Sequence, residues 1–224
     1  MTAPFDLVIF DCDGVLVDSE PLSNAVLAAA LTRAGLPTSA EQAVATYKGL
    51  HIRDVIARAE AGLGAPLPDG FIPAYERARA DAFRRELAAV AGAAEAVRAI
   101  SAAGIAVCVA SQGKLAKTEL TLGLTGLRPL FAQGALFSAH DVARGKPHPD
   151  LFLHAAARMG ASPGRSVVVE DTPIGVTAAV AAGMRAIGYA ADSDRAGLRR
   201  AGADLVLDSL GELAPALGLA PSQS

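Results

Sequence analysis

Three short apolar runs, each followed at once by polar residues, constrain the fold of this chain more than any other feature. They cover residues 5–10, 105–110 and 166–169 and are rich in Val and Ile. β-branched residues favour strands, and a strand that is apolar along most of its length is typical of one covered on both faces. We therefore predict three buried strands. Weaker candidates for further strands are residues 135–138, 186–189 and 205–207.

Helical patterns separate these predicted strands. Residues 91–103 precede the second strand, residues 151–159 precede the third, and residues 176–184 follow it. Buried strands that alternate with helices indicate a parallel sheet with helices on both faces. The sequence therefore predicts an α/β fold with a doubly wound parallel sheet of the Rossmann type.

One long interval breaks this alternation. Between residues 19 and 90 we find no strand pattern, only amphipathic helix patterns at 22–34, 53–61 and 71–87. A connection between two parallel strands needs far fewer residues than this interval contains. We therefore expect an all-helical subdomain of residues 19–90, inserted into a core that consists of residues 1–18 and 91–224.

The composition argues against several kinds of partner. The formal net charge is -3, aromatic residues make up 4% and Trp is absent, which disfavours binding to nucleic acid or to an anionic membrane. The longest uncharged segment, residues 99–113, is shorter than the roughly 20 residues that a membrane-spanning helix needs. No basic residue precedes Asp6, so no signal peptide is visible. We expect a soluble, cytoplasmic protein that binds neither nucleic acid nor membranes.

The polar residues that follow the predicted strands are candidate functional residues. Asp11 and Asp13 follow the first strand, Ser111 the second, and Glu170 with Asp171 the third. Ligands of open parallel sheets bind at the carboxyl ends of the strands, so these side chains should lie along one edge. Two carboxylates on one turn repel each other unless a cation lies between them. With Asp171 added, the all-oxygen set suits Mg²⁺ and predicts a magnesium site.

Two further segments suit a bound anion. Lys146 opens the segment Lys146-Pro147-His148-Pro149, in which the prolines limit the freedom of the backbone. Ser111-Gln112-Gly113 leads into a helix that we expect to begin near Lys114, and helix N-termini bind anions. A carboxylate nucleophile, a hard metal ion, a lysine and a helix N-terminus together indicate phosphoryl transfer.

The order of these motifs resembles that of a known family. The segment Asp11-x-Asp13-Gly14-x-Leu16-x-Asp18-Ser19 resembles the first motif of the haloacid dehalogenase (HAD) superfamily of phosphohydrolases. Ser111, Lys146-Pro147 and Glu170-Asp171 resemble its second, third and fourth motifs, so the resemblance covers essentially the whole chain. The helical insert is similar to the α-helical cap of the branch that contains β-phosphoglucomutases and phosphoglycolate phosphatases.

The resemblance implies a role for each motif residue. Asp11 would attack phosphorus and become an aspartyl-phosphate, while Asp13 would protonate the leaving oxygen and then deprotonate the attacking water. The implied Mg²⁺ ligands are Asp11, the backbone carbonyl of Asp13, and Asp171, with Glu170 as a ligand or an outer partner. The implied phosphate-binding groups are Ser111, the backbone at Gln112, and Lys146.

The resemblance also suggests a class of substrate. Related enzymes carry a substrate-contacting loop in the cap, where this chain has Lys48, Gly49 and Arg53, and two cations suit an anionic substrate. The chain is also similar to sugar-phosphate and phosphogluconate phosphatases of the same branch, in the segments Asp11-Cys12-Asp13-Gly14 and Val17-Asp18-Ser19-Glu20 and in the Lys48-Gly49 pair. We expect a Mg²⁺-dependent phosphomonoester hydrolase that acts on a small phosphorylated metabolite, a sugar or sugar-acid phosphate. The sequence leaves the oligomeric state open.

Two alternatives remain at this point. The first is a hexose-phosphate mutase of the β-phosphoglucomutase type, but those mutases carry a cap histidine ten residues after the second aspartate, where this chain has Ser23. The second is a phospho-accepting signalling domain of the receiver type, which also combines acidic residues, a hydroxyl and a Lys-Pro pair. The chain is too long for one receiver domain, and Glu170-Asp171 follows the lysine. Ser23 at the histidine position therefore favours hydrolysis over a mutase, and the length and motif order favour an enzyme over a receiver domain.

Overall fold

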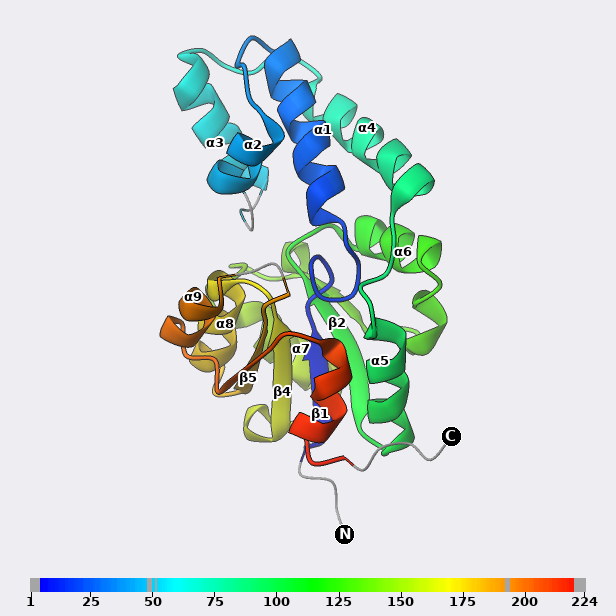
Figure 1. Cartoon of the computed structure of the whole chain (residues 1–224). Helices are drawn as coiled ribbons and strands as arrows, with labels where there is room; N and C mark the ends of the chain where they lie inside the picture. The colour runs from blue at the N-terminus through cyan, green and yellow to red at the C-terminus, as the bar shows by residue number, and fades with distance from the viewer. Residues whose placement is uncertain (1–4, 48–49, 51, 192–193, 220–224) are drawn as a thin grey trace. The chain divides into compact units, whose positions relative to one another are not determined.

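The computed structural model describes residues 5–47, 50, 52–191 and 194–219 (Figure 1). The chain forms two compact units, one of Met1–Val17 with Ala89–Ser224 and one of Asp18–Ala88. These divisions lie next to the boundaries expected at 18/19 and 90/91. The chain segments that lead from the larger unit into the smaller one and back are paired through an antiparallel bridge between Val17 and Ala89. This pairing defines where the insert leaves the core.

The larger unit contains a six-stranded sheet in the order β3-β2-β1-β4-β5-β6. All its strand pairs are parallel. The strands are β1 (Leu7–Phe10), β2 (Ala106–Ser111), β3 (Leu136–Ser138), β4 (Ser166–Glu170), β5 (Arg185–Tyr189) and β6 (Leu205–Leu207). Each coincides with one of the six predicted segments to within two residues, and the predicted doubly wound sheet is confirmed. The strand order reverses beside β1, which lies between β2 and β4.

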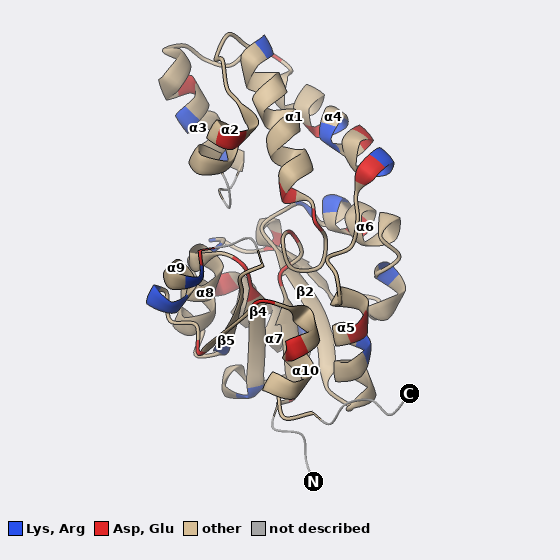
Figure 2. Cartoon of the chain, viewed as in Figure 1, with Lys and Arg blue, Asp and Glu red and all other residues tan. Residues whose placement is uncertain are grey.

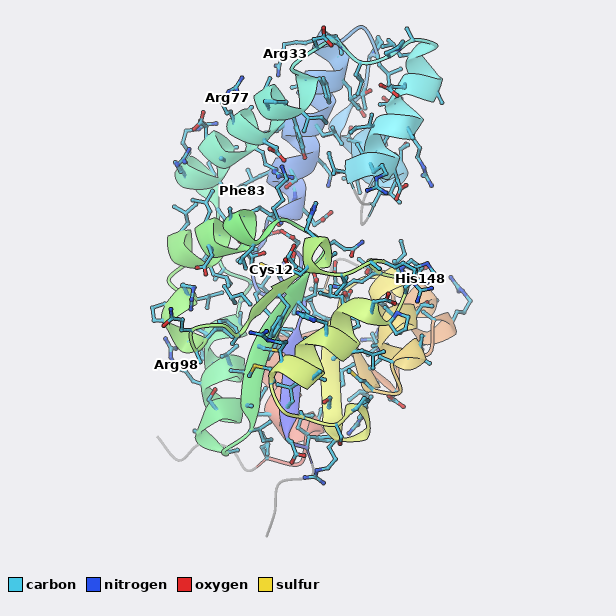
Figure 3. The ribbon with its side chains drawn as sticks, turned by 180° about the vertical axis from the view of Figure 1, so that it is seen from behind. Cys12, Arg33, Arg77, Phe83, Arg98 and His148 are labelled. Atoms are coloured by element: carbon cyan, nitrogen blue, oxygen red, sulfur yellow. The ribbon has the colours of Figure 1, made fainter. Side chains whose placement is uncertain are left out.

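Helices cover both faces of this sheet. They are α5 (Ala93–Ala102), α6 (Leu115–Leu124), α7 (Asp150–Arg158), α8 (Pro173–Ala181), α9 (Arg195–Arg200) and α10 (Leu213–Ala216). Short 3₁₀ turns are η1 (Arg128–Leu130), η2 (Ala139–Asp141), η3 (Pro163–Arg165) and η4 (Leu210–Glu212). Figures 1 and 3 show α5 with α10 on one face and α7 with α8 on the other. Because β1 and β4 are buried along their whole length, both faces require this cover.

The smaller unit consists of α1 (Glu20–Arg33), α2 (Ala40–Tyr47), α3 (Ile52–Leu63) and α4 (Phe71–Glu86). It has a hydrophobic core of its own, to which Leu31, Tyr47, Ala59 and Tyr75 each contribute from a different helix. The sequence patterns indicated α1, α3 and α4. They did not single out α2, in which only Ala43 and Tyr47 are buried. Across the described ranges, no helix combines the length and the apolar character needed to span a membrane.

Candidate active site

The candidate residues of the core lie at the carboxyl ends of three neighbouring strands. Asp11 follows β1 directly, Ser111 is the last residue of β2, and Glu170 is the last residue of β4. Since β1 pairs with β2 on one side and with β4 on the other, these ends meet where the strand order reverses. Figure 2 shows acidic residues at these ends of β1 and β4. This switch point is the usual ligand site of a doubly wound sheet.

Lys146 is the central cation of the site. Its Nζ lies 2.5 Å from Oδ1 of Asp11 and 2.5 Å from Oε1 of Glu170, and it donates to the carbonyl of Ala110 at 3.1 Å. These contacts satisfy all three N–H groups of the ammonium. The side chain is only 2% exposed, so the charge is removed almost entirely from water. The structure thus brings together Asp11, Lys146 and Glu170, which are far apart in the sequence.

The charges of this cluster shift its pKa values. The pKa of Asp11 is raised to about 7. Burial is the main cause; the ammonium of Lys146 opposes it, and the carboxylates of Glu170 and Asp13 add to it. Burial alone would lower the pKa of Lys146, but Asp11 and Glu170 outweigh this effect and raise it. Two buried carboxylates therefore share one cation, and a second cation beside Asp11 would relieve the surplus of negative charge.

Glu170 is held at both carboxylate oxygens. Oε1 contacts Lys146, while Oε2 accepts from the Thr172 hydroxyl at 2.9 Å and from its N–H at 3.1 Å. Gly175, in the first turn of α8, leaves room for this side chain, since a Cβ at that position would overlap the Glu170 carboxylate. In this arrangement Glu170 fixes Lys146 relative to the start of α8.

Three buried carboxylates form a group that could hold a metal ion. Asp11, Glu170 and Asp171 each offer an oxygen, and these atoms all lie within 4.8 Å of one another. Gly14 allows Asp171 to approach, because its φ is +78° and a Cβ there would lie 2.5 Å from Asp171 Oδ2. The all-oxygen set and its net negative charge fit a hard divalent ion such as Mg²⁺. Asp13 adds no carboxylate to this group, and a contribution from its backbone carbonyl stays a prediction.

Asp13 contacts a residue that sequence reasoning missed. Its Oδ2 forms an ion pair with Nζ of Lys117, which lies in the first turn of α6. A sequence signal was available, because a lysine in the first turn of a helix opposes the helix dipole and so needs a separate explanation. The ion pair supplies that explanation.

The segment after β2 also connects to the lysine loop. Oγ of Ser111 accepts from the N–H of Gly113 at 3.1 Å. The side chain of Gln112 accepts from the N–H of Lys146 at 3.0 Å and donates to its carbonyl at 3.4 Å. Gln112 was predicted to act through its backbone, whereas here its side-chain amide holds the backbone of Lys146. The roles of Ser111 and Gln112 in phosphate binding stay predictions.

The substrate residues predicted in the insert are only partly described. Lys48 and Gly49 lie outside the described residues. Arg53 lies in the first turn of α3, within the smaller unit, and is exposed. Its role toward a substrate stays a prediction.

A doubly wound sheet with carboxylates and a lysine at its switch point is typical of α/β enzymes that bind a ligand there. Comparison with known proteins identifies which of these enzymes the chain resembles. The family model for haloacid dehalogenase-like hydrolases matches residues 5–183. The chain therefore belongs to the haloacid dehalogenase-like hydrolases, and the predicted resemblance is confirmed.

Individual relatives agree with this assignment. The 6-phosphogluconate phosphatase of Escherichia coli K12 is 31% identical over 84% of this chain and 83% of the relative. Hexitol phosphatase B of the same organism is also 31% identical, over 92% of each chain. A HAD family hydrolase from Deinococcus radiodurans, crystallised with bound phosphate and sodium, is 34% identical with a TM-score of 0.80, covering 99% of this chain and 100% of that one. The prediction of an enzyme of the HAD phosphatase type is thus confirmed.

Proposed function

We propose that the protein is a Mg²⁺-dependent phosphomonoester hydrolase that acts on a small phosphorylated metabolite through an aspartyl-phosphate at Asp11. The observation that carries this proposal is the arrangement around Asp11, whose buried carboxylate lies beside the Lys146 ammonium and within a group of three carboxylates. A phosphoryl group needs a nucleophile and neutralisation of its oxygens, and this arrangement can supply both.

The reaction divides into two steps. In the first, an oxygen of Asp11 forms a bond to phosphorus, the ester P–O bond breaks, and the leaving oxygen takes a proton from Asp13. In the second, water attacks the phosphorus of the aspartyl-phosphate and gives its proton to Asp13. The bond to Asp11 breaks, and inorganic phosphate leaves.

The other residues hold charge in place during both steps. Lys146 lies against Asp11, where its positive charge would neutralise the phosphoryl oxygens, and Ser111 and the backbone at Gln112 would donate hydrogen bonds to them. Asp11, Asp171 and the backbone carbonyl of Asp13 would hold Mg²⁺, with Glu170 as the partner that fixes Lys146. When bound, Mg²⁺ supplies positive charge that neutralises the phosphoryl oxygens.

The substrate class is proposed from the relatives. The two Escherichia coli relatives are a 6-phosphogluconate phosphatase and a hexitol phosphatase. We propose a sugar or sugar-acid phosphate, whose non-reacting end would be bound by Lys48, Gly49 and Arg53 of the helical unit acting as a cap. We also propose that the enzyme works in the cytoplasm, where such metabolites occur.

The test is release of inorganic phosphate from a panel of esters. The purified protein would be assayed with 6-phosphogluconate, hexitol phosphates, phosphoglycolate and an aryl phosphate, each with Mg²⁺ and with a chelator. Mg²⁺-dependent release from at least one metabolite is expected. The mutase alternative predicts instead isomerisation of a hexose phosphate that depends on added sugar bisphosphate. No release from any ester would contradict the proposal.

A further inference from the structure

The ion pair between Lys117 and Asp13 has no function in the reaction proposed above, in which Asp13 takes part but Lys117 does not. Nζ of Lys117 contacts Oδ2 of Asp13, and the two side chains are only 14% and 21% exposed. Exposed ion pairs contribute little because water screens them and their side chains are mobile. A largely buried pair beside a reaction centre is better placed to fix the direction of the carboxylate.

The position of Lys117 in its helix does not favour a lysine. It is the third residue of α6, whose first turn contains no acidic residue. The partial positive charge at a helix N-terminus repels a cation. Lys117 has a favourable contact outside its own helix, at Asp13.

The path of the Lys117 side chain is restricted by the segment after β2. A Cβ at Gly113 would lie 3.0 Å from Cδ of Lys117, so the stem of the lysine runs close over that glycine. Gly113 itself is fixed, because its N–H donates to Ser111 Oγ at 3.1 Å and its carbonyl accepts from Ser138 Oγ at 2.7 Å. The lysine thus reaches Asp13 over a rigid piece of backbone.

Helix α6 also contacts the aspartate turn at a second point. Oγ1 of Thr121 lies 3.6 Å from Sγ of Cys12, and both residues are buried. Residues four apart in a helix lie on the same face, so Thr121 and Lys117 face the turn of Asp11–Asp13 together. The helix is therefore anchored to the same turn whose carboxylate Lys117 holds.

We propose that Lys117 is a positioning residue that holds the Asp13 carboxylate in the orientation needed for proton transfer. In this role Lys117 acts through Asp13. This proposal rests on the proposed function, which gives Asp13 its part in the reaction. Lys117 lies in α6, outside the residues of the four motifs. The proposal therefore adds to the site an orienting group that the motifs do not contain.

The test is a double-mutant cycle on phosphate release from the preferred ester. The variants are Lys117→Met, Asp13→Asn and the two combined. Since general acid–base catalysis contributes about 10²–10⁴-fold, Lys117→Met is expected to lower kcat by about tenfold or more, with little change in KM. In the Asp13→Asn background the same change should have no further effect, within about twofold. Equal losses in the two backgrounds would overturn the proposal, because Lys117 would then act independently of Asp13.

Two further measurements keep the outcome unambiguous. Lys117→Arg retains the charge and should recover part of the lost kcat, whereas an Arg variant as impaired as the Met variant would count against positioning by an ion pair. The same four proteins are unfolded by heat in chelator, where a positive coupling between Lys117 and Asp13 is expected and its absence would show that the contact does not form. If the wild type releases phosphate but the cycle shows no coupling, the positioning role alone is refuted. If the wild type releases none, the proposed function itself fails.

Discussion

Replacement of Gly175 by alanine tests the packing behind the candidate active site. This glycine lies in the first turn of α8, and its N–H donates to the Thr172 hydroxyl at 3.1 Å. An alanine Cβ would overlap the carboxylate of Glu170, whose side chain is 1% exposed and holds Lys146 at 2.5 Å. The carboxylate cannot move away without losing the contact with Lys146 or with Thr172.

The expected loss of stability follows from these contacts. Overpacking of a rigid site costs about 1–3 kcal/mol, while alanine in place of glycine returns up to about 1 kcal/mol through helix propensity. If Glu170 moves away from Lys146, the loss of one partner of a buried ion pair adds about 3–5 kcal/mol. We expect a net destabilisation of about 0–3 kcal/mol if Glu170 keeps its contact with Lys146 and of about 3–8 kcal/mol if it moves away. Each kcal/mol lowers Tm by about 2–4 °C in a chain of this size. Activity should fall as well, because Lys146 loses its support.

The assay is thermal unfolding followed by circular dichroism, with phosphate release measured on the same samples. A matched control is Gly123→Ala in α6, because Gly123 is also helical and exposed but has open space where its Cβ would be. That variant should be as stable as the wild type or up to about 1 kcal/mol more stable. If Gly175→Ala proved as stable and as active as Gly123→Ala, the close packing of Glu170 against α8 would be refuted.

Two other predictions concern the metal group and the thiols. Mg²⁺ should raise the Tm of the wild type, because at one hundred times its Kd it adds about 2.7 kcal/mol to the free energy of unfolding. Asp171→Asn should remove most of this shift. An equal shift in both proteins would place the metal elsewhere. Burial raises the pKa of both Cys12 and Cys108, and neither side chain is exposed. At mildly alkaline pH the thiols of the native protein should therefore react only slowly with a disulfide reagent, whereas both thiols of the unfolded protein should react quickly. Fast reaction of the native protein would contradict the burial of the thiols.

The sheet could be predicted because its signals are local. Apolar runs such as residues 166–169 are strand-like by composition, and the polar residues after them mark the strand ends. The observed β4, Ser166–Glu170, differs from that run by one residue. Helix α2 was not singled out because it has only eight residues, Ala40–Tyr47, and so short a helix offers few turns over which an apolar period can be recognised.

The contacts within the site could be predicted only in part. The resemblance places Asp11, Lys146 and Glu170 in one site, but it does not show that Glu170 has both oxygens in use. Lys117 meets Asp13 only because α6 lies beside the turn after β1, and this depends on how the helix packs, which no local pattern encodes. The side-chain contact of Gln112 with the lysine loop depends on tertiary packing in the same way.

The most direct test of the proposed function compares phosphate release by the wild type and by Asp11→Asn with saturating Mg²⁺ and the preferred ester. An amide has nearly the volume of the carboxylate but cannot act as the nucleophile, so the variant should release phosphate at the uncatalysed background rate. A cooperative unfolding transition in the variant would show that it is folded, even if loss of the charge beside Lys146 lowers its Tm. Wild-type release with background release by a folded Asp11→Asn is the result we predict. Release by the folded variant at a rate near that of the wild type would contradict an aspartyl-phosphate at Asp11.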